Sequence, residues 1–128
     1  SIARGQSVIS AAGPAPKGKA WSYGDGKAFA VKPIKRVGDF FAHGTEGNTH
    51  IVHGPSGMSI AHYQWKDAGI KALNGLAKRG AKLSAGLSRG DESALKTMVR
   101  YNRATRTSRY QGAAMKAASV KRGASFTY

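Results

Sequence analysis

Four histidines are the residues whose type and spacing most directly suggest chemistry. His43, His50, His53 and His62 lie within a stretch of twenty residues. Imidazoles gain and lose protons near neutral pH, and their neutral form binds transition metals. Two kinds of site follow from these properties. One is a metal centre, and the other is a metal-independent nuclease with a general base, a general acid and a cation at the phosphate.

A metal centre is the less favoured of the two interpretations. Zinc prefers three or four converging ligands, whereas His50 and His53 would face opposite sides of a strand. The acidic residues nearby are Asp39, Glu46 and Asp67, and the chain has no cysteine that would supply a thiolate or a disulfide. We therefore expect no metal and no other cofactor.

A ribonuclease site stays open as an alternative. His50, His53 or His62 would supply the acid and base, and Lys66 or Arg100 the cation. Small basic ribonuclease toxins have this composition, but so has any basic protein with several histidines. Our first expectation is that the protein is not an enzyme and has no catalytic residues, with the role of the four histidines, including His43, left open.

The stronger signal is the charge. The chain has 21 Lys and Arg residues against 6 Asp and Glu residues, a formal net charge of +15. Residues 93–128 carry eight cations and no acidic residue. Like charges at this density repel one another, so a polyanionic partner explains them better than an ordinary solvated face does. Nucleic acid is the first candidate for that partner, and an anionic membrane surface is the second.

Binding is expected to rest on phosphate contacts, without sequence specificity. No zinc finger, RNP box or base-reading helix is recognisable in the sequence. The residues predicted to contact nucleic acid are Lys71, Lys78, Arg79, Lys82, Lys96, Arg100, Arg103, Arg106, Arg109, Lys121 and Arg122.

The elements that must position these side chains are predicted to be mainly helical. Residues 1–22 are rich in Gly and Pro and predict an extended arm, and residues 23–128 a single small domain. Within it, 23–59 is irregular, and helical periodicity over 60–128 predicts a small bundle of about three helices. The first helix should stop at Gly80, residues 82–90 form a loop, and two helices follow over about 91–109 and 111–122.

The irregular part contains weak strand signals. Residues 28–31 read as a short strand, and 49–53 and 58–61 flank a Gly54–Gly57 turn as in a short β-hairpin. Gly24-Asp25-Gly26-Lys27 is similar to part of a phosphate loop, but it lacks the full glycine spacing and the hydroxyl residue after the lysine.

One stretch invites comparison with a known family. Tyr63-Gln64 is followed by Gly69-Ile70-Lys71-Ala72-Leu73-Asn74, which leads to Gly80. This stretch resembles the lysine-bearing helix of the coat proteins of rod-shaped and filamentous archaeal viruses. The resemblance implies subunits that wrap double-stranded DNA, hold it in the A form and interlock through their N-terminal arms.

The sequence thus predicts a non-enzymatic structural protein that packages nucleic acid, namely a virion coat or nucleocapsid subunit. Its partners would be nucleic acid, with double-stranded DNA favoured over RNA, and many copies of itself in a helical assembly; no segment is expected to span a membrane. The alternatives are a ribosomal or nucleoid-type protein in the cytoplasm and the ribonuclease toxin. DNA versus RNA, the host and the assembly symmetry stay open.

Overall fold

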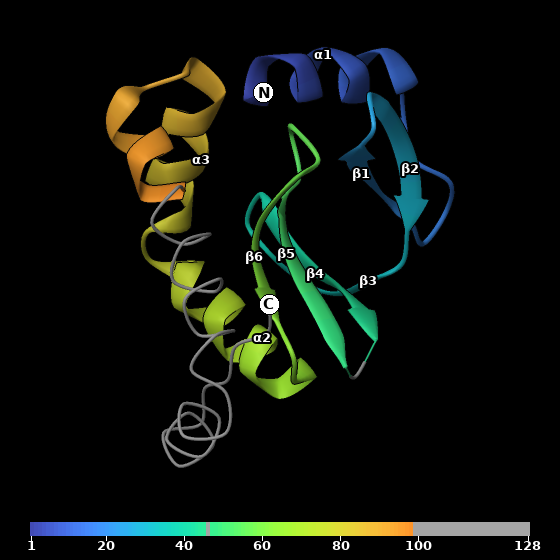
Figure 1. Ribbon diagram of the computed structural model, residues 1–128, viewed down its shortest axis with the longest axis vertical. Helices are drawn as coiled ribbons and strands as arrows, with labels where there is room; N and C mark the ends of the chain where they lie inside the picture. The colour runs from blue at the N-terminus through green and yellow to red at the C-terminus, as the bar shows by residue number, and fades with distance from the viewer. Residues whose placement is uncertain (46, 99–128) are drawn as a thin grey trace.

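The structure is a computed structural model that describes residues 1–45 and 47–98. Its elements are α1 (Ile2–Ala12), β1 (Ala20–Gly24), β2 (Lys27–Val31), β3 (Pro33–Val37), β4 (Phe40–Thr45), β5 (Asn48–His53), β6 (Met58–Tyr63), α2 (Lys66–Asn74), the 3₁₀ helix η1 (Gly75–Ala77) and α3 (Gly80–Arg89) (Figure 1). Residues 92–98 are also helical. This is an α+β fold, so the predicted mainly α bundle is wrong.

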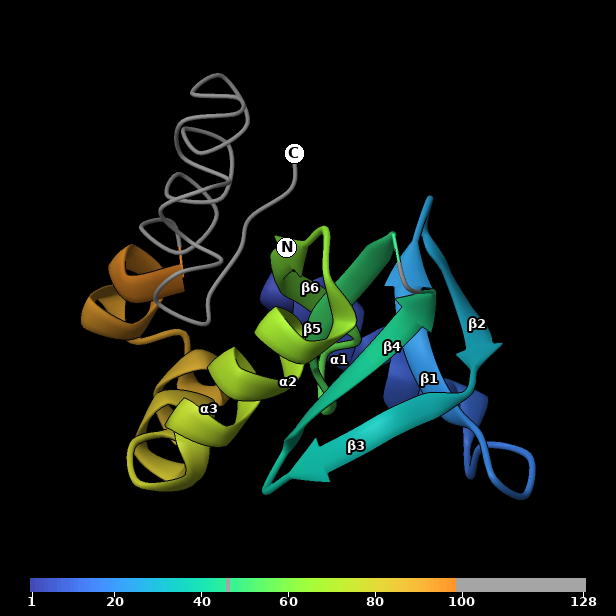
Figure 2. The ribbon, with the colours of Figure 1, turned by 90° about the horizontal axis from the view of Figure 1, so that it is seen from below.

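A four-stranded antiparallel sheet in the order β3-β4-β5-β6 forms the centre of the fold. The helices α2, η1 and α3 lie on one side of it, the separate β1-β2 hairpin lies on the other, and α1 crosses one end (Figures 1 and 2). Each strand of the sheet is joined to the next by a short turn, which fixes the pairing of residues across neighbouring strands.

Both faces of the sheet are covered over part of their area. Phe40 and Ile51 pack against helix residues such as Leu73 and Leu87. On the other face, Phe41 and Val52 pack against Ala20 of the hairpin. Because successive strand residues point to opposite faces, burial on both sides removes the alternation of apolar and polar residues that marks a strand in a sequence.

The Asp25-Gly26 pair forms the tight turn between β1 and β2. Both residues have positive φ angles, 53° and 77°, which a type I′ hairpin turn requires. The likeness of Gly24–Lys27 to a phosphate loop is therefore explained by a structural turn.

The N-terminal segment is helical over 2–12, so the extended arm expected there is wrong for these residues. The Ser1 hydroxyl caps α1 by accepting from the Arg4 amide at 3.3 Å. Gly5 is buried so close to the β5-β6 turn that a Cβ atom on it would lie 2.3 Å from the Ser56 carbonyl oxygen. The indole N–H of Trp21 donates to the Gly13 carbonyl at 2.7 Å and holds the end of α1 beside β1.

In the C-terminal half, the predicted helix from residue 60 to Gly80 is divided differently. Residues 58–63 pair with β5 as a strand, which confirms the predicted hairpin but places the helix start at Lys66. The predicted loop 82–90 is helix α3, which ends at Gly90 with a left-handed φ of 76°. The rest of the predicted helices over 91–109 and 111–122, beyond residue 98, lies outside the described residues.

No helix within residues 1–45 and 47–98 is long and apolar enough to cross a bilayer.

Candidate functional site

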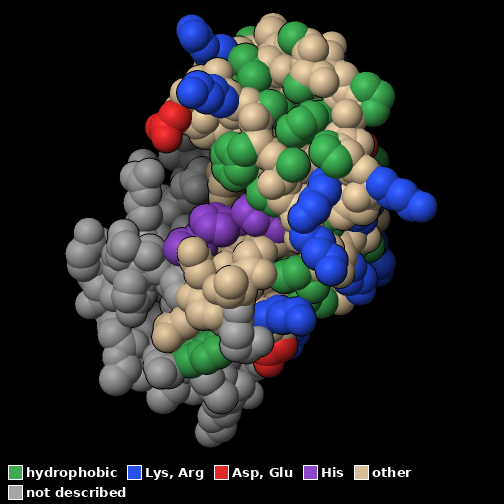
Figure 3. Space-filling view, turned by 90° about the vertical axis from the view of Figure 1, so that its right-hand side faces the viewer, with side chains coloured by type: hydrophobic (Ala, Val, Ile, Leu, Met, Phe, Trp, Pro, Cys, Tyr) green, Lys and Arg blue, Asp and Glu red, His purple; other side chains and the backbone are tan. Residues whose placement is uncertain are grey.

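Three of the four histidines stand side by side on one face of the sheet, and we call His43, His50 and His62 the histidine row. His43 of β4 is directly opposite His50 of β5, which in turn is opposite His62 of β6. The first two rings have centroids 5.2 Å apart, and the second pair is 4.4 Å apart, both nearly parallel. Figure 3 shows histidine side chains as a continuous row across this face, with Lys and Arg side chains beside one end.

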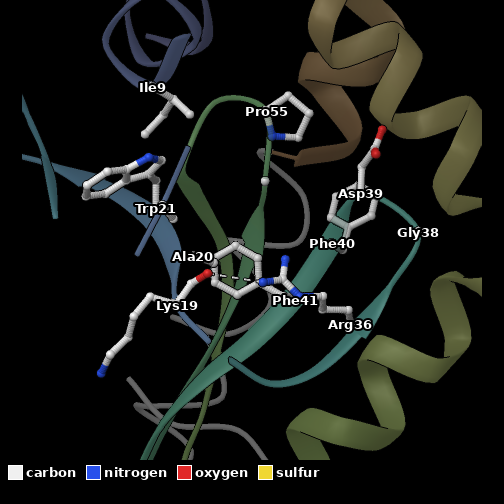
Figure 4. A pocket seen from close by; sticks show the side chains of 12 residues that line it. Ile9, Lys19, Ala20, Trp21, Arg36, Gly38, Asp39, Phe40, Phe41 and Pro55 are labelled. Atoms are coloured by element: carbon white, nitrogen blue, oxygen red, sulfur yellow. Dashed lines mark hydrogen bonds between the residues drawn. The ribbon is translucent and has the colours of Figure 1, made fainter. Parts of the chain in front are cut away.

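Phe41 lies between the histidine row and the cation Arg36. The Phe41 and His43 rings are 6.0 Å apart, and the guanidinium carbon of Arg36 lies 5.8 Å from the Phe41 ring centroid. Arg36 also donates to the Lys19 carbonyl at 3.3 Å and forms part of the wall of a cavity of about 430 Å³ that Trp21 also lines (Figure 4). A positive charge is therefore held near one end of the row.

Hydrogen bonds fix two of the rings. Ser59 Oγ lies 3.3 Å from His50 Nδ1 and 3.4 Å from the Ala61 carbonyl oxygen. A hydroxyl has one proton, and the carbonyl can only accept it, so we assign the proton between Ser59 and His50 to Nδ1. In the neutral ring this leaves His50 Nε2 as an acceptor. His62 Nε2 donates to Asn48 Oδ1.

The row is neutral at physiological pH at two of its three positions. Burial, followed by the proximity of His50, lowers the pKa of His43 to about 4, and burial lowers the pKa of His50. Within the part of the chain that the structure describes, His50 Nε2 and both ring nitrogens of His43 have no protein hydrogen-bond partner. These nitrogens are available to a ligand.

Stacking limits the chemistry of the row. The two faces of the His50 ring are covered by His43 and His62, so the edges that carry the nitrogens remain for contacts. Bases stack on exposed ring faces, whereas ring edges donate and accept hydrogen bonds. The arrangement therefore suits an oxyanion or a proton transfer more than it suits base stacking.

His53 is separated from the other three. It lies on the helix-facing side of β5 with its side chain fully buried. Its Nδ1 lies 2.7 Å from Ser56 Oγ and its Nε2 3.0 Å from Ser84 Oγ, and Ser84 in turn donates to Asp39 Oδ2 at 2.6 Å. Burial lowers the pKa of His53, and the charge of Asp39 partly opposes this. Because its polar atoms bind protein groups in the interior, His53 is structural.

No group of three or more His, Cys, Asp or Glu side chains among the described residues is placed to hold a metal ion.

A second feature is a cavity of about 560 Å³ beside α3, which we call the basic groove. It is bordered by η1, α3 and the helical residues 92–98, and its lining includes Lys78, Arg79, Lys82 and Arg89. Arg89 is paired with Asp91 at 2.7 Å. Lys78, Arg79 and Lys82 have no carboxylate partner within residues 1–45 and 47–98, so the groove has an excess of positive charge.

The other predicted nucleic-acid contacts are placed apart from this groove or are not described. Lys71 is exposed on α2, and Lys96 is exposed and paired with Glu92 at 3.1 Å; neither lines the groove. The predicted contacts Arg100, Arg103, Arg106, Arg109, Lys121 and Arg122 lie outside the described residues. Of the ribonuclease candidates, His50 and His62 come together, His53 lies on the other side of the sheet, and Arg100 is not described.

Sequence reasoning missed His43 as a neighbour of His50, and Arg89 as part of the groove. A signal for the first exists once residues 40–45 are known to form a strand, because Thr45 pairs with Asn48 and the same register places His43 opposite His50. Comparison of the chain with protein-family models, curated proteins and solved structures gave no match.

Proposed function

We propose that this protein binds and packages nucleic acid without sequence specificity and without enzymatic activity, most concretely as a coat or nucleocapsid subunit on double-stranded DNA. The observation that carries the proposal is the basic groove, where Lys78, Arg79 and Lys82 lie together and have no carboxylate partner within the described residues; the carboxylate in the lining, Asp91, is paired with Arg89. The net charge of +15 supports the same conclusion.

The physical mechanism is counter-ion release. Each cation that replaces a condensed counter-ion on a phosphate makes binding more salt-sensitive. For duplex DNA, each such contact steepens the fall of log K with log salt concentration by about 0.9. Cations without acidic partners interact with the phosphates without competition from a neighbouring carboxylate. Carboxylate pairs such as Arg89 with Asp91 would weaken the contact, and the groove has one of these against three unpaired cations.

The test is the binding of a short duplex DNA to the protein over a salt series. The variant Lys78→Ala/Arg79→Ala should bind more weakly to all sequences alike and lower the slope by about 1.8, the share of two phosphate contacts. The matched control is Lys17→Ala/Lys27→Ala, which removes the same charge from exposed positions near the hairpin. Equal losses in both variants, or a loss confined to one DNA sequence, would reject the groove as the contact surface.

The coat and nucleocapsid proposal also requires many copies in a regular array. It predicts continuous protection of long DNA that saturates at a fixed mass ratio. A ribosomal or nucleoid-type protein would instead bind a defined RNA or cover DNA sparsely.

A metal-independent ribonuclease is the second candidate, and the histidine row favours it. In that mechanism His50 Nε2 takes the proton of a 2′-hydroxyl as its oxygen attacks phosphorus. At a pH acidic enough to protonate a neighbouring ring of the row, that ring gives a proton to the departing 5′-oxygen, and a 2′,3′-cyclic phosphate forms. RNA would be cut and DNA spared, and His50→Gln would abolish cutting. Cleavage that survives this substitution would exclude the row as its source.

A further inference from the structure

We propose that the histidine row is a phosphate-binding site, separate from the basic groove, that takes up a proton together with the anion. The site stands on the geometry of His43, His50 and His62. Its assignment to nucleic-acid phosphates, as opposed to free phosphate, rests on the proposed function.

The first support is the set of ring nitrogens left without partners. His50 uses Nδ1 for Ser59 and His62 uses Nε2 for Asn48, while His50 Nε2 and both nitrogens of His43 have no hydrogen bond to the described protein. The row is only half-buried. Donors fixed on rigid neighbouring strands lose little conformational entropy when they bind, and the protonated imidazole is a donor at both nitrogens.

The second support is the charge around the row. Arg36 on β3 lies against Phe41, which contacts His43, so a permanent cation stands at one end. On β5 and β6, His50 and His62 have hydrogen bonds with the neutral groups of Ser59 and Asn48. The charge that acts on His43 is that of His50, and among the described residues no carboxylate acts on either ring. Among the described residues, an anion at His43 and His50 would therefore meet positive or neutral groups.

The third support is thermodynamic. Burial lowers the pKa of both His43 and His50, and the proximity of His50 lowers the pKa of His43 further, so both rings are held in the neutral form. A phosphate oxyanion at the ring edges favours the charged form and must raise those values, since binding and protonation are linked. A rise of one pKa unit corresponds to tenfold tighter binding of the anion by the protonated ring. Binding at the row should therefore strengthen as the pH falls, whereas binding at the basic groove should not.

The experiment follows the four histidines of the full chain by NMR over a pH titration. The probes are inorganic phosphate and a short thymidine oligonucleotide, which has no 2′-hydroxyl to cleave. Sodium chloride at matched ionic strength is the reference. Both probes should raise the pKa of His43 by about one unit or more relative to chloride. His53 is the internal control, because it is buried in hydrogen bonds on the other side of the sheet and should not respond.

Two variants separate this proposal from the proposed function. His50→Gln should remove the probe-dependent shift of the His43 pKa. Lys78→Ala/Arg79→Ala should weaken salt-sensitive duplex binding at about pH 8 and leave that shift of the His43 pKa in place. A shift with inorganic phosphate but not with the oligonucleotide would support the phosphate site and reject nucleic acid as its ligand. No shift in the row with either probe, or an equal shift of His53, would overturn the site.

Discussion

His50 and His62 stack with ring centroids 4.4 Å apart because the β5-β6 hairpin places them directly opposite each other. His43 extends the stack on the other side of His50. Protonation of one ring disfavours protonation of its neighbour. Because the rings are stacked only in the folded sheet, their protonation is linked to the stability of the sheet.

Acid should therefore weaken the fold. The pKa of His43 is lowered to about 4, and those of His50 and His53 are also lowered. The unfolded chain then binds more protons than the folded one below about pH 6.5. The stability contributed by these groups is fully present above that pH and is lost as the pH falls toward about 4. Urea unfolding at a series of pH values measures this loss, and His43→Gln should make it shallower. An unchanged profile in this variant would contradict the assignment.

Close packing of α2 on β5 predicts a sharp difference between two glycines. A Cβ atom at Gly69 would lie 2.6 Å from the Thr49 Cγ2 atom in the core, whereas one at Gly75 would meet nothing within 4 Å. Gly69→Ala should lower the free energy of unfolding by about 1–3 kcal/mol. Gly75→Ala should leave it unchanged or raise it slightly, since its φ of −62° suits any residue. Chemical denaturation of both variants checks this, and equal stabilities would show that α2 does not approach β5 as described.

The buried hydrogen bonds of Ser84 should matter more than its size suggests. Ser84→Ala leaves His53 Nε2 and Asp39 Oδ2 without their hydroxyl partner. The expected loss of unfolding free energy is about 1–3 kcal/mol. Ser88→Ala, an exposed position on the same helix, is the control and should be near neutral. If thermal unfolding shows both variants to be equally stable, the link between α3 and the β3-β4 turn is not formed.

Part of the fold could be predicted from the sequence. The turn-forming residues Gly54–Gly57 were sufficient to predict the β5-β6 hairpin, and the structure confirms it. The rest of the sheet could not be found because Phe40 and Phe41 are buried on opposite faces, which hides the strand period. The sequence pattern predicts a helix end at Gly80, yet Gly80 opens α3, where its small size lets the helix approach Phe40.

The residue types of the candidate site could be predicted from the sequence, but their arrangement in space could not. Sequence reasoning correctly placed His50 and His53 on opposite sides of a strand, and the structure has one in the row and the other in the core. It could not align His43 with His50 without knowing that residues 40–45 form a strand. The clustering of Lys78, Arg79 and Lys82 with Arg89 also depends on the angle between η1 and α3, which is set by tertiary packing.

Nuclease protection of long double-stranded DNA across a salt series, with a labelled RNA alongside, is the decisive measurement for the packaging function. A packaging protein should give continuous protection that saturates at a fixed mass ratio, and its affinity should fall by several decades between low and moderate salt, as about 6 to 10 phosphate contacts per subunit require. DNA left unprotected at every salt concentration while the RNA is cut into fragments would contradict it and favour the ribonuclease.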